Sequence, residues 1–453
     1  MAGITNTYDP TSTAQALAEA FTSGRQTILT RQTTQATATE KGLSTLGTAL
    51  NTFQSALASL TGLNKTISAN SAVFSDTSIA SATATATAAS GTYSFFVEQV
   101  ASAHKVSYGG MSDFAGGGSL TLGAGTNSFN IDLGTKTTWT VRDLAAAING
   151  ATDNTSISAA VVATSATTSE LVLTSKTTGL ANKITLTTTG ASAGLTSKVG
   201  AGVTPNQLAP ALDAVVRVGS SSGTPITQAS NTFNVIDGVT MTIAKAQAAG
   251  SAPVTVTVAS DASKTTANAQ AFVDAYNKLK SAIDGLVSPG DPASGGAAGA
   301  FAGDSGVRAL RDRLVSMLRN TGATTLANFG ITANREGTLS LDSTRLTKAL
   351  AADPTGLDTL IGSSSATAPT GIAGQLDSYL KLWTNSANGQ IGSRKDAVSK
   401  LQDELADRQT ALDKQYDGAY ARYLKQFTQL QSVQSNMSYN TSLFDALFSS
   451  AKD

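Results

Sequence analysis

The sequence has no cysteine, few aromatic residues and little charge. Without cysteine, none of its 453 residues can form a disulfide, a thiolate zinc site or a cysteine nucleophile. Aromatic residues make up 6% and charged residues 14% of the chain, while alanine, threonine, serine and glycine dominate. We therefore expect cores that are packed largely with small side chains.

Net charge and long hydrophobic runs are also missing. The 31 basic and 31 acidic residues balance, so no global field favours binding to nucleic acid or to an anionic membrane. No run approaches the roughly 18 apolar residues that are needed to cross a bilayer. Residues 1–10 have neither the basic nor the apolar part of a Sec signal peptide, so secretion would need another route.

The clearest positive signal is a heptad pattern in the C-terminal segment, which begins near residue 375. Apolar residues recur at steps of seven, and one step of four moves them from d to a positions of a single frame. The residues are Ile391, Val398, Leu405 and Leu412, then Tyr416, Tyr423, Leu430 and Met437. This spacing predicts a coiled-coil helix, although Lys395, Gln402 and Gln409 occupy a positions. Such a helix needs a partner to cover its stripe.

A matching stripe lies near the other end of the chain. Its spacing of threes and fours predicts a helix over residues 43–70, and a weaker stripe with Leu17, Phe21 and Ile28 predicts helix from Ala14 onward. The strong stripe is Leu43, Leu46, Leu50, Phe53, Leu57 and Leu60, followed by Leu63 and Ile67. We expect the two ends of the chain to lie side by side, with residues 5–13 flexible.

The middle of the chain reads as β-rich. Alternation over residues 82–87 and the string 93–100 predict strands, and dense glycines follow from 109 to about 210. One helix is expected there, over 141–149, with Gly150 in the C′ position. Further strands are expected at 214–218, 231–235, 239–244 and 253–259, with a hairpin turn at Asp237-Gly238. Helix returns at Asp261 or Ser263, either of which can serve as N-cap.

The last third of the chain is expected to be mostly helical. Helices are predicted over 307–319 and 343–351, a hairpin over 331–341, and a linker over 363–369. The fold class is therefore α+β multidomain, with N- and C-terminal helices forming a coiled-coil or helical-bundle leg and two β-rich head domains inserted. We expect a terminal coiled-coil region (1–42 and 396–453, flexible before assembly), a helical leg (43–76 and 261–395), an inner head (77–108 and 209–260) and an outer head (109–208).

Several strings resemble the flagellar filament cap family, also called flagellar hook-associated protein 2. The most specific are 231–243, 254–261 and 271–279, followed by 301–308, 329–332 and 337–342. The ends at 43–60 and 423–430 also look like the coiled-coil ends of that family. In the outer head, residues 139–188 resemble the small insert repeat of flagellins and their caps.

The resemblance implies a structural protein and not an enzyme. Its members form an extracellular plate of identical subunits at the flagellar tip, where they promote folding and insertion of flagellin and prevent its loss. We accordingly expect export by the flagellar type III route and self-association as a pentamer or a nearby stoichiometry. Expected partners are flagellin, hook–filament junction proteins, an export chaperone and, through the outer head, host mucin or glycans. A flagellin, a junction protein or a surface adhesin remains the alternative.

Catalytic and ligand sites are weakly indicated. Gly303-Asp304-Ser305-Gly306 has the residues of a serine-hydrolase loop, but the one histidine, His104, is far away in sequence. Capping of the following helix by Asp304 or Ser305 is the preferred interpretation, and His104 beside Lys105 is expected at the surface. No calcium loop or phosphate loop occurs, so no metal or cofactor is expected.

The predicted functional surface therefore lies on the terminal helices. The aromatic stripe on the C-terminal helix either packs as core within one chain or meets another chain or the filament. The candidate oligomer and filament contacts are Leu17, Phe21, Ile28, Tyr416, Tyr420, Tyr423 and Phe427.

Overall fold

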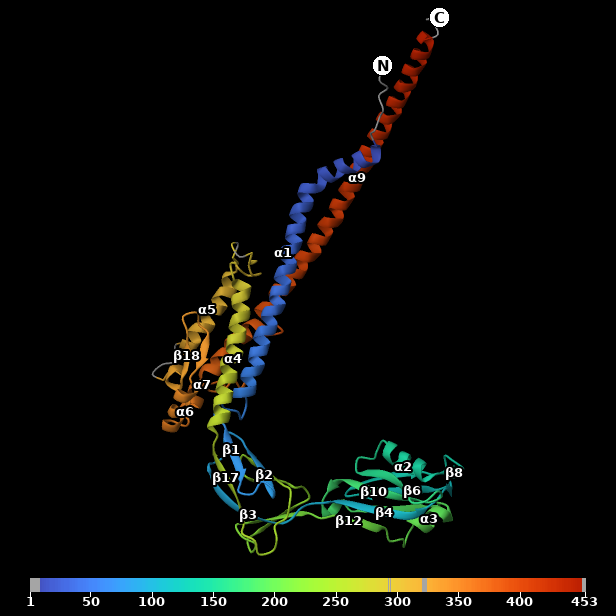
Figure 1. The fold of residues 1–453 in the computed structure, drawn as a ribbon, viewed down its shortest axis with the longest axis vertical. Coiled ribbons are helices and arrows are strands. Elements are labelled where there is room, and N and C mark those ends of the chain that lie inside the picture. Colours follow the sequence, from blue (N-terminus) through green and yellow to red (C-terminus); the bar gives the residue numbers. More distant parts are fainter. Residues whose placement is uncertain (1–8, 292, 294, 320–323, 450–453) are drawn as a thin grey trace. The chain divides into compact units, whose positions relative to one another are not determined.

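The computed structural model describes residues 9–291, 293, 295–319 and 324–449, so part of the segment predicted to be flexible lies outside the described residues. Contacts divide the chain into two compact units (Figure 1). The second is Ser68–Thr265, and the first comprises the described residues on either side of it. The α+β multidomain class, with terminal helices around an inserted β-rich region, is confirmed. The finer division into four parts stays a prediction.

Helices dominate the first unit, and its first helix is longer than predicted. Helix α1 (Pro10–Thr61) starts at Pro10 because Asp9 caps it, accepting hydrogen bonds from the N–H groups of Thr11 and Ser12 at 3.2 and 3.0 Å. The other elements are α4 (Ala262–Val287), α5 (Ser305–Arg319), η2 (Leu326–Phe329), β18 (Ile331–Ala333), β19 (Leu339–Leu341), α6 (Ser343–Ala352), α7 (Gly356–Ile361), α8 (Gly371–Thr384) and α9 (Gln390–Ser449).

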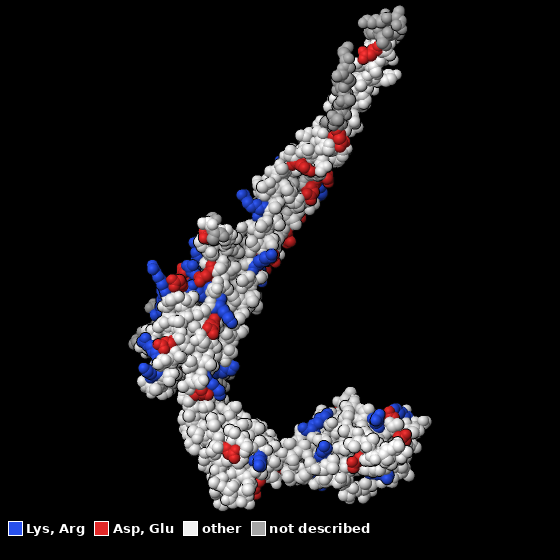
Figure 2. Space-filling model, viewed as in Figure 1, with Lys and Arg blue, Asp and Glu red and all other residues white. Residues whose placement is uncertain are grey.

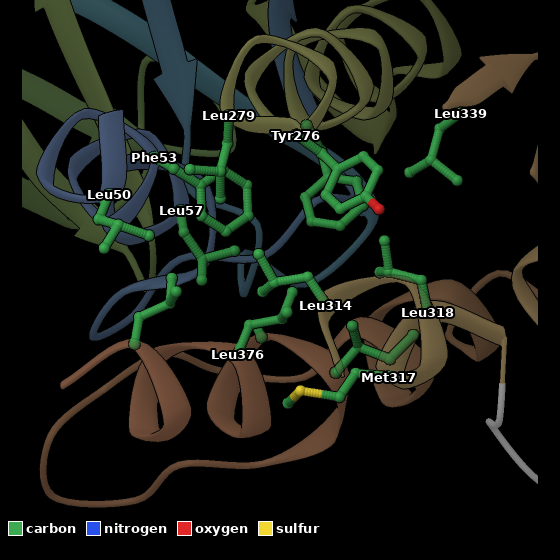
Figure 3. Packing of buried hydrophobic residues seen from close by; sticks show 14 of the residues in the cluster. Leu50, Phe53, Leu57, Tyr276, Leu279, Leu314, Met317, Leu318, Leu339 and Leu376 are labelled. Carbon is green, nitrogen blue, oxygen red and sulfur yellow. The ribbon is translucent and has the colours of Figure 1, made fainter. Parts of the chain in front are cut away.

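The strong leucine stripe of α1 forms the core of this unit. Leu50, Phe53 and Leu57 pack with residues of α4, α5 and α8 (Figure 3). The Phe53 and Tyr276 rings meet edge to face, 6.4 Å between centroids, and the Tyr276 hydroxyl donates to the Gly337 carbonyl at 3.2 Å. Burial raises the pKa of Tyr276, so this hydroxyl stays a donor. The hairpin predicted over 331–341 is thereby attached to the helical core.

The end of α1 corrects the sequence interpretation. The helix stops at Thr61 and does not reach residue 70, because Gly62 follows with an extended backbone. Ile67 is nevertheless buried in the core, whereas Leu63 is exposed. Apolar spacing alone therefore does not show whether a residue belongs to the helix or lies in the following loop and still packs in the core. The short helix α7 was also not predicted.

In the second unit, two antiparallel sheets cover one hydrophobic cluster, and these two sheets are here called its inner part. Asp237-Gly238 forms the predicted turn, with Gly238 at φ 72° and Ile236 opposite Val239. The first sheet runs β1 (Asn70–Phe74), β17 (Val254–Ser260), β3 (Gly91–Gln99), β13 (Ala214–Val218), β14 (Pro225–Gln228). The second runs β15 (Thr232–Ile236), β16 (Val239–Ile243), β2 (Ala80–Ala84).

The outer part has its own core, which two sheets and two helices enclose. One sheet runs β12 (Asn206–Ala209), β4 (Ala103–Met111), β10 (Ser169–Thr178), β9 (Ile157–Ala163), and the other β11 (Ile184–Thr189), β6 (Ser119–Ala124), β7 (Asn127–Asp132). The helices are α2 (Val141–Gly150) and α3 (Ala193–Val199), beside the short β5 (Phe114–Ala115), β8 (Thr138–Trp139) and η1 (Leu180–Asn182).

Two expectations for this region are wrong. Only one helix, over 141–149, was predicted here, but the structure has a second helix, α3. Gly150 is the last residue of α2 and not a left-handed C′ residue, because Ala151 ends the helix with φ −65° and ψ 127°. The start of α2 has a capping box, in which Thr140 and Asp143 exchange backbone and side-chain hydrogen bonds.

Asparagine side chains pair with the backbone at several places. Asn149 donates to the carbonyl of Ala159 at 2.7 Å and accepts from its N–H at 2.9 Å, as a neighbouring strand would. Asn154 pairs with Ile157 in the same way, so the backbone groups of two residues of the edge strand β9 are satisfied by side-chain amides. Asn231 with Ala101 and Asn277 with Leu339 repeat the arrangement.

Candidate assembly surface on the terminal helices

Helices α1 and α9 pack antiparallel along much of their length (Figure 1). Gln402 donates to Glu40 at 2.8 Å. Further along, Gln26 and Gln409 exchange two amide hydrogen bonds of 3.1 and 3.0 Å. Residue numbers fall along α1 as they rise along α9, which fixes the antiparallel direction. The predicted pairing of the two ends of the chain is therefore confirmed.

The buried seam follows the predicted d positions of α9. Val398, Leu405, Leu412 and, one heptad later, Ala419 are buried. On α1 the covered residues are mostly small, namely Ala14, Ala18, Thr22 and Ala36 together with Leu29. Small residues on α1 let the backbone of α9 approach closely, which suits the alanine-rich composition.

The polar a positions have a structural role. Gln402 and Gln409 are half-buried and take their partners from α1, as described above. A polar pair inside a seam favours one register, because any shift leaves amide groups without hydrogen bonds. These positions therefore stabilise one register of the leg at some cost in apolar contact.

The three predicted contact residues on α1 are exposed. Leu17, Phe21 and Ile28 keep 39%, 47% and 51% of their surface accessible. Steps of four and seven place them on one face of α1, beside the face that covers α9. None of the three belongs to the buried seam, and Phe21 meets α9 only at its edge, through Arg422. That this stripe contacts another chain stays a prediction.

The predicted aromatic stripe on α9 is half-buried. Tyr416 and Tyr420 stack with parallel rings, 6.4 Å between centroids. Tyr423 and Phe427 follow on the same face and are also half-buried. Each ring is thus partly covered and partly in water, and whether the stripe meets another chain or the filament stays a prediction.

Arginine side chains join the two stripes. The Arg422 guanidinium lies 5.0 Å from the Tyr423 ring and 6.0 Å from the Phe21 ring, and Arg25 lies 5.7 Å from Phe21 on its own helix. Cation–π contacts of this kind stabilise aromatic rings that remain partly in water. Sequence reasoning missed both arginines, because apolar periodicity carries no signal for them.

The loop with the hydrolase-like residues is structural. Asp304 accepts from the N–H of Val307 at 2.9 Å, which confirms it as the N-cap of α5. Its other oxygen binds Arg394 of α9 at 2.7 Å. These bonds lower the pKa of Asp304 against the opposing effect of burial, so the carboxylate stays charged.

His104 is not at the surface, which overturns the expectation from its neighbour Lys105. It is 2% exposed, and its Nδ1 accepts a hydrogen bond from the N–H of Ile184 at 2.9 Å. Burial, with a smaller contribution from Lys183, lowers the pKa of His104, so the imidazole is neutral at pH 7. Alternation along β4 places His104 inward and Lys105 outward. His104 joins β4 to β11 and is not accessible as a base.

In the part of the chain that the structure describes, no three histidine, aspartate or glutamate side chains come together in a way that could hold a metal ion. Among the same residues, no helix has the length and apolar character needed to span a bilayer.

Comparison with known proteins identifies the family. The model of the flagellar hook-associated protein 2 C-terminus matches residues 211–439, and that of its N-terminus matches residues 6–104. Between them, the flagellin hook IN motif matches residues 119–177, which overlaps the predicted insert repeat. The resemblance inferred from the sequence is therefore confirmed.

Individual relatives agree along most of the chain. The lateral flagellar hook-associated protein 2 of Vibrio parahaemolyticus is 33% identical over 83% of this chain and 85% of its own length. The B-type protein of Pseudomonas aeruginosa is 30% identical over 90% of both chains. The solved D1-D2-D3 domains of the flagellar cap protein FliD from Escherichia coli align with a TM-score of 0.60 and 28% identity, over 79% of this chain and 99% of that one. The chain belongs to the flagellar hook-associated protein 2 family.

Proposed function

We propose that this protein is the cap of a bacterial flagellar filament. It assembles from identical subunits into a plate at the distal tip, outside the cell. There it promotes folding and insertion of flagellin and prevents loss of flagellin subunits. Export follows the flagellar type III route, with an export chaperone and the hook–filament junction proteins as further partners. Family membership and the solved cap protein from Escherichia coli support this assignment.

The exposed apolar stripe on α1 is the structural observation that carries the proposal. Leu17, Phe21 and Ile28 expose large apolar side chains on a helix whose other face is already occupied. Leaving such a stripe in water costs roughly 25 cal/mol for each Å² that a partner could cover. A contact with a neighbouring subunit or with the filament removes this cost.

The α1–α9 seam suits a part that must move after each subunit is inserted. Its apolar residues alternate with amide pairs, and its aromatic rings are held by cation–π contacts near water. Each such contact is individually weak, about 1 kcal/mol. A leg built in this way is able to change partners without a single large barrier. The pentamer or nearby stoichiometry expected from the resemblance stays a prediction.

Charge reversal of the stripe tests the proposal. In the variant Phe21→Glu with Ile28→Glu, both side chains are exposed, so the chain should fold normally by circular dichroism. We expect a smaller mass by light scattering and, in the cell, loss of motility with flagellin released into the medium. The matched control is Ala16→Glu with Ser23→Glu, which adds the same charge to exposed positions away from the stripe. Full motility and unchanged mass in the stripe variant would contradict the proposal.

A further inference from the structure

The heptad pattern of α9 continues beyond the region that α1 covers. Steps of three and four connect a second stripe, here named the distal seam, and lead on to Leu447 with the same spacing. Its large apolar members are strongly exposed: Leu430 45%, Val433 54%, Met437 64% and Phe444 59%. Asn440 occupies the remaining d position between Met437 and Phe444, and it is exposed as well. The distal seam thus consists of Leu430, Val433, Met437, Asn440 and Phe444.

Helix α1 ends at about the level where this stripe begins. The cross-helix contacts pair Glu40 with Gln402, Gln26 with Gln409 and Phe21 with Arg422. Extending this antiparallel register places Pro10, the first residue of α1, level with about residue 430. Figure 1 shows α9 continuing past the N-terminal end of α1. Among the described residues of α9, none beyond Ala419 is buried.

The chemistry of the distal seam fits a second copy of itself. From Gln426 to Ser449 the only charged residue is Asp445, and Figure 2 shows this end of the helix almost without charge. The flanking e and g positions are Gln429, Asn436 and Thr441 among others, all uncharged. In coiled coils, charges at these positions select a different partner or repel an identical one. The distal seam has no such charges, so nothing at these positions opposes pairing with an identical helix.

We propose that the distal seam pairs with the distal seams of other copies of this chain, as a parallel coiled coil. This inference rests on the homo-oligomer of the proposed function, because identical subunits in a closed ring bring identical segments to the same level and in the same direction. It continues the α1–α9 seam with the same helix and the same heptad frame.

The residue types indicate more than two strands. Leu430 stands at an a position and the β-branched Val433 at d, an arrangement that resembles those of coiled coils with more than two strands. Leu443, at the g position beside Phe444, is 50% exposed and widens the apolar face. A wider face suits a bundle in which each helix touches two neighbours.

Asn440 fixes the register of this bundle. When all copies are level, the asparagines meet and can hydrogen bond with one another. A shift by one heptad step brings Asn440 against apolar residues and leaves its amide without a partner, which is unfavourable. A polar residue at one core position is a common device for this purpose.

The absence of cysteine permits a direct test on the full chain. Met437→Cys introduces the only thiol of the chain, at a core position of the distal seam. Ser435→Cys, two residues away at an f position, is the matched control. Under mild oxidation we expect the Met437→Cys chain to form a disulfide-linked dimer at least tenfold faster than the control. Both positions are exposed in the single chain, so neither variant should disturb folding.

The outcomes separate this inference from the proposed function. If the chain is oligomeric by light scattering but the two cysteine variants cross-link equally slowly, the distal seam docks elsewhere, for example on the filament, and the inference is overturned while the cap remains. A chain that stays monomeric at every concentration also overturns it, and the cap is then judged by flagellin leakage in a deletion strain. Asn440→Val is expected to strengthen association while yielding more than one oligomer size.

Discussion

At the scale of single residues, His104 shows how a buried polar group connects two sheets. Its Nδ1 accepts the N–H of Ile184, which ties β4 to β11 inside the outer part of the second unit. An accepting Nδ1 must be unprotonated, so protonation breaks this bond and places a positive charge in a buried site near Lys183. The histidine therefore stabilises the fold only in its neutral form.

This predicts that acid weakens the outer part of the second unit. The pKa of His104 is lowered on folding from an ordinary value of 6.5, so the unfolded chain binds the proton more readily. The stability that neutral His104 contributes is fully present above pH 6.5. It falls as the pH drops toward the lower pKa of the folded chain, by at most about 1.4 kcal/mol per pH unit. Urea unfolding at pH 7.5 and 5.5, followed by Trp139 fluorescence in a Trp383→Phe background, measures this.

The control for this experiment is a chain without the titrating group. His104→Gln keeps an acceptor for Ile184, and its stability should be the same at the two pH values. His104 is the only histidine of the chain, so no other histidine can produce the effect. An equal pH dependence in the two proteins would show that carboxylates, and not this imidazole, are responsible.

At the scale of elements, the α1–α9 pair depends on a seam that mixes apolar and polar contacts. Leu29 and Ala36 of α1 pack with Leu405 and Leu412 of α9 in a small cluster of their own. The reciprocal amide bonds of Gln26 and Gln409 occupy the neighbouring layer. We infer that the amide pair specifies register and that the apolar layers supply most of the stability.

A double-mutant cycle on these glutamines follows from this inference. Gln26→Leu alone removes both bonds across the seam, leaves Gln409 with Asp413 of its own helix as partner, and should destabilise the pair by about 1–2 kcal/mol. Gln26→Leu with Gln409→Leu should be at least as stable as the natural chain, because two leucines can pack across the seam. Urea unfolding by circular dichroism measures both, with Gln32→Leu as an exposed control on α1. Additive effects of the two changes would show that the glutamines act independently.

At the scale of the whole molecule, the outer part of the second unit is an insertion with adjacent ends. Ser102 and Leu212 flank it and are joined by two backbone hydrogen bonds of 3.0 and 3.4 Å. The strands that lead in and out, β4 and β12, are paired neighbours in one sheet. Few hydrogen bonds of the inner sheets involve the residues between Ser102 and Leu212.

Removal of this insertion should therefore leave the rest of the chain folded. Replacing residues 103–211 by a short Gly-Ser linker keeps the Ser102–Leu212 bridge and removes Trp139. The remaining Trp383, which is buried in the first unit, should report an unfolding midpoint like that of the full chain. A lower midpoint or an insoluble product would refute this. Binding to mucin by the full chain, if lost in the shortened one, would assign adhesion to the outer head.

The sequence alone determined most of the elements and the family. Heptad spacing predicted α9 and its pairing with α1, and Asp237-Gly238 predicted a hairpin turn, because these signals are local and repeat along one helix or across one turn. Strings such as 231–243 and 271–279 contain Asn231 and Asn277, whose amides pair with the backbone of Ala101 and Leu339. Their role could not be inferred from spacing, since it depends on the distant backbone segment that each amide meets.

The tertiary structure decided what is covered and what is not. The apolar residues Ile67 and Leu63 look alike in the sequence, yet one is buried in the core and the other is in water, and His104 is enclosed although Lys105 suggested a surface position. Along α9 the heptad frame also runs unbroken, while α1 covers it only as far as the aromatic stripe that begins at Tyr416. A periodic pattern states which side chains share a face. Whether a partner lies on that face depends on contacts between residues hundreds of positions apart, which no local pattern contains.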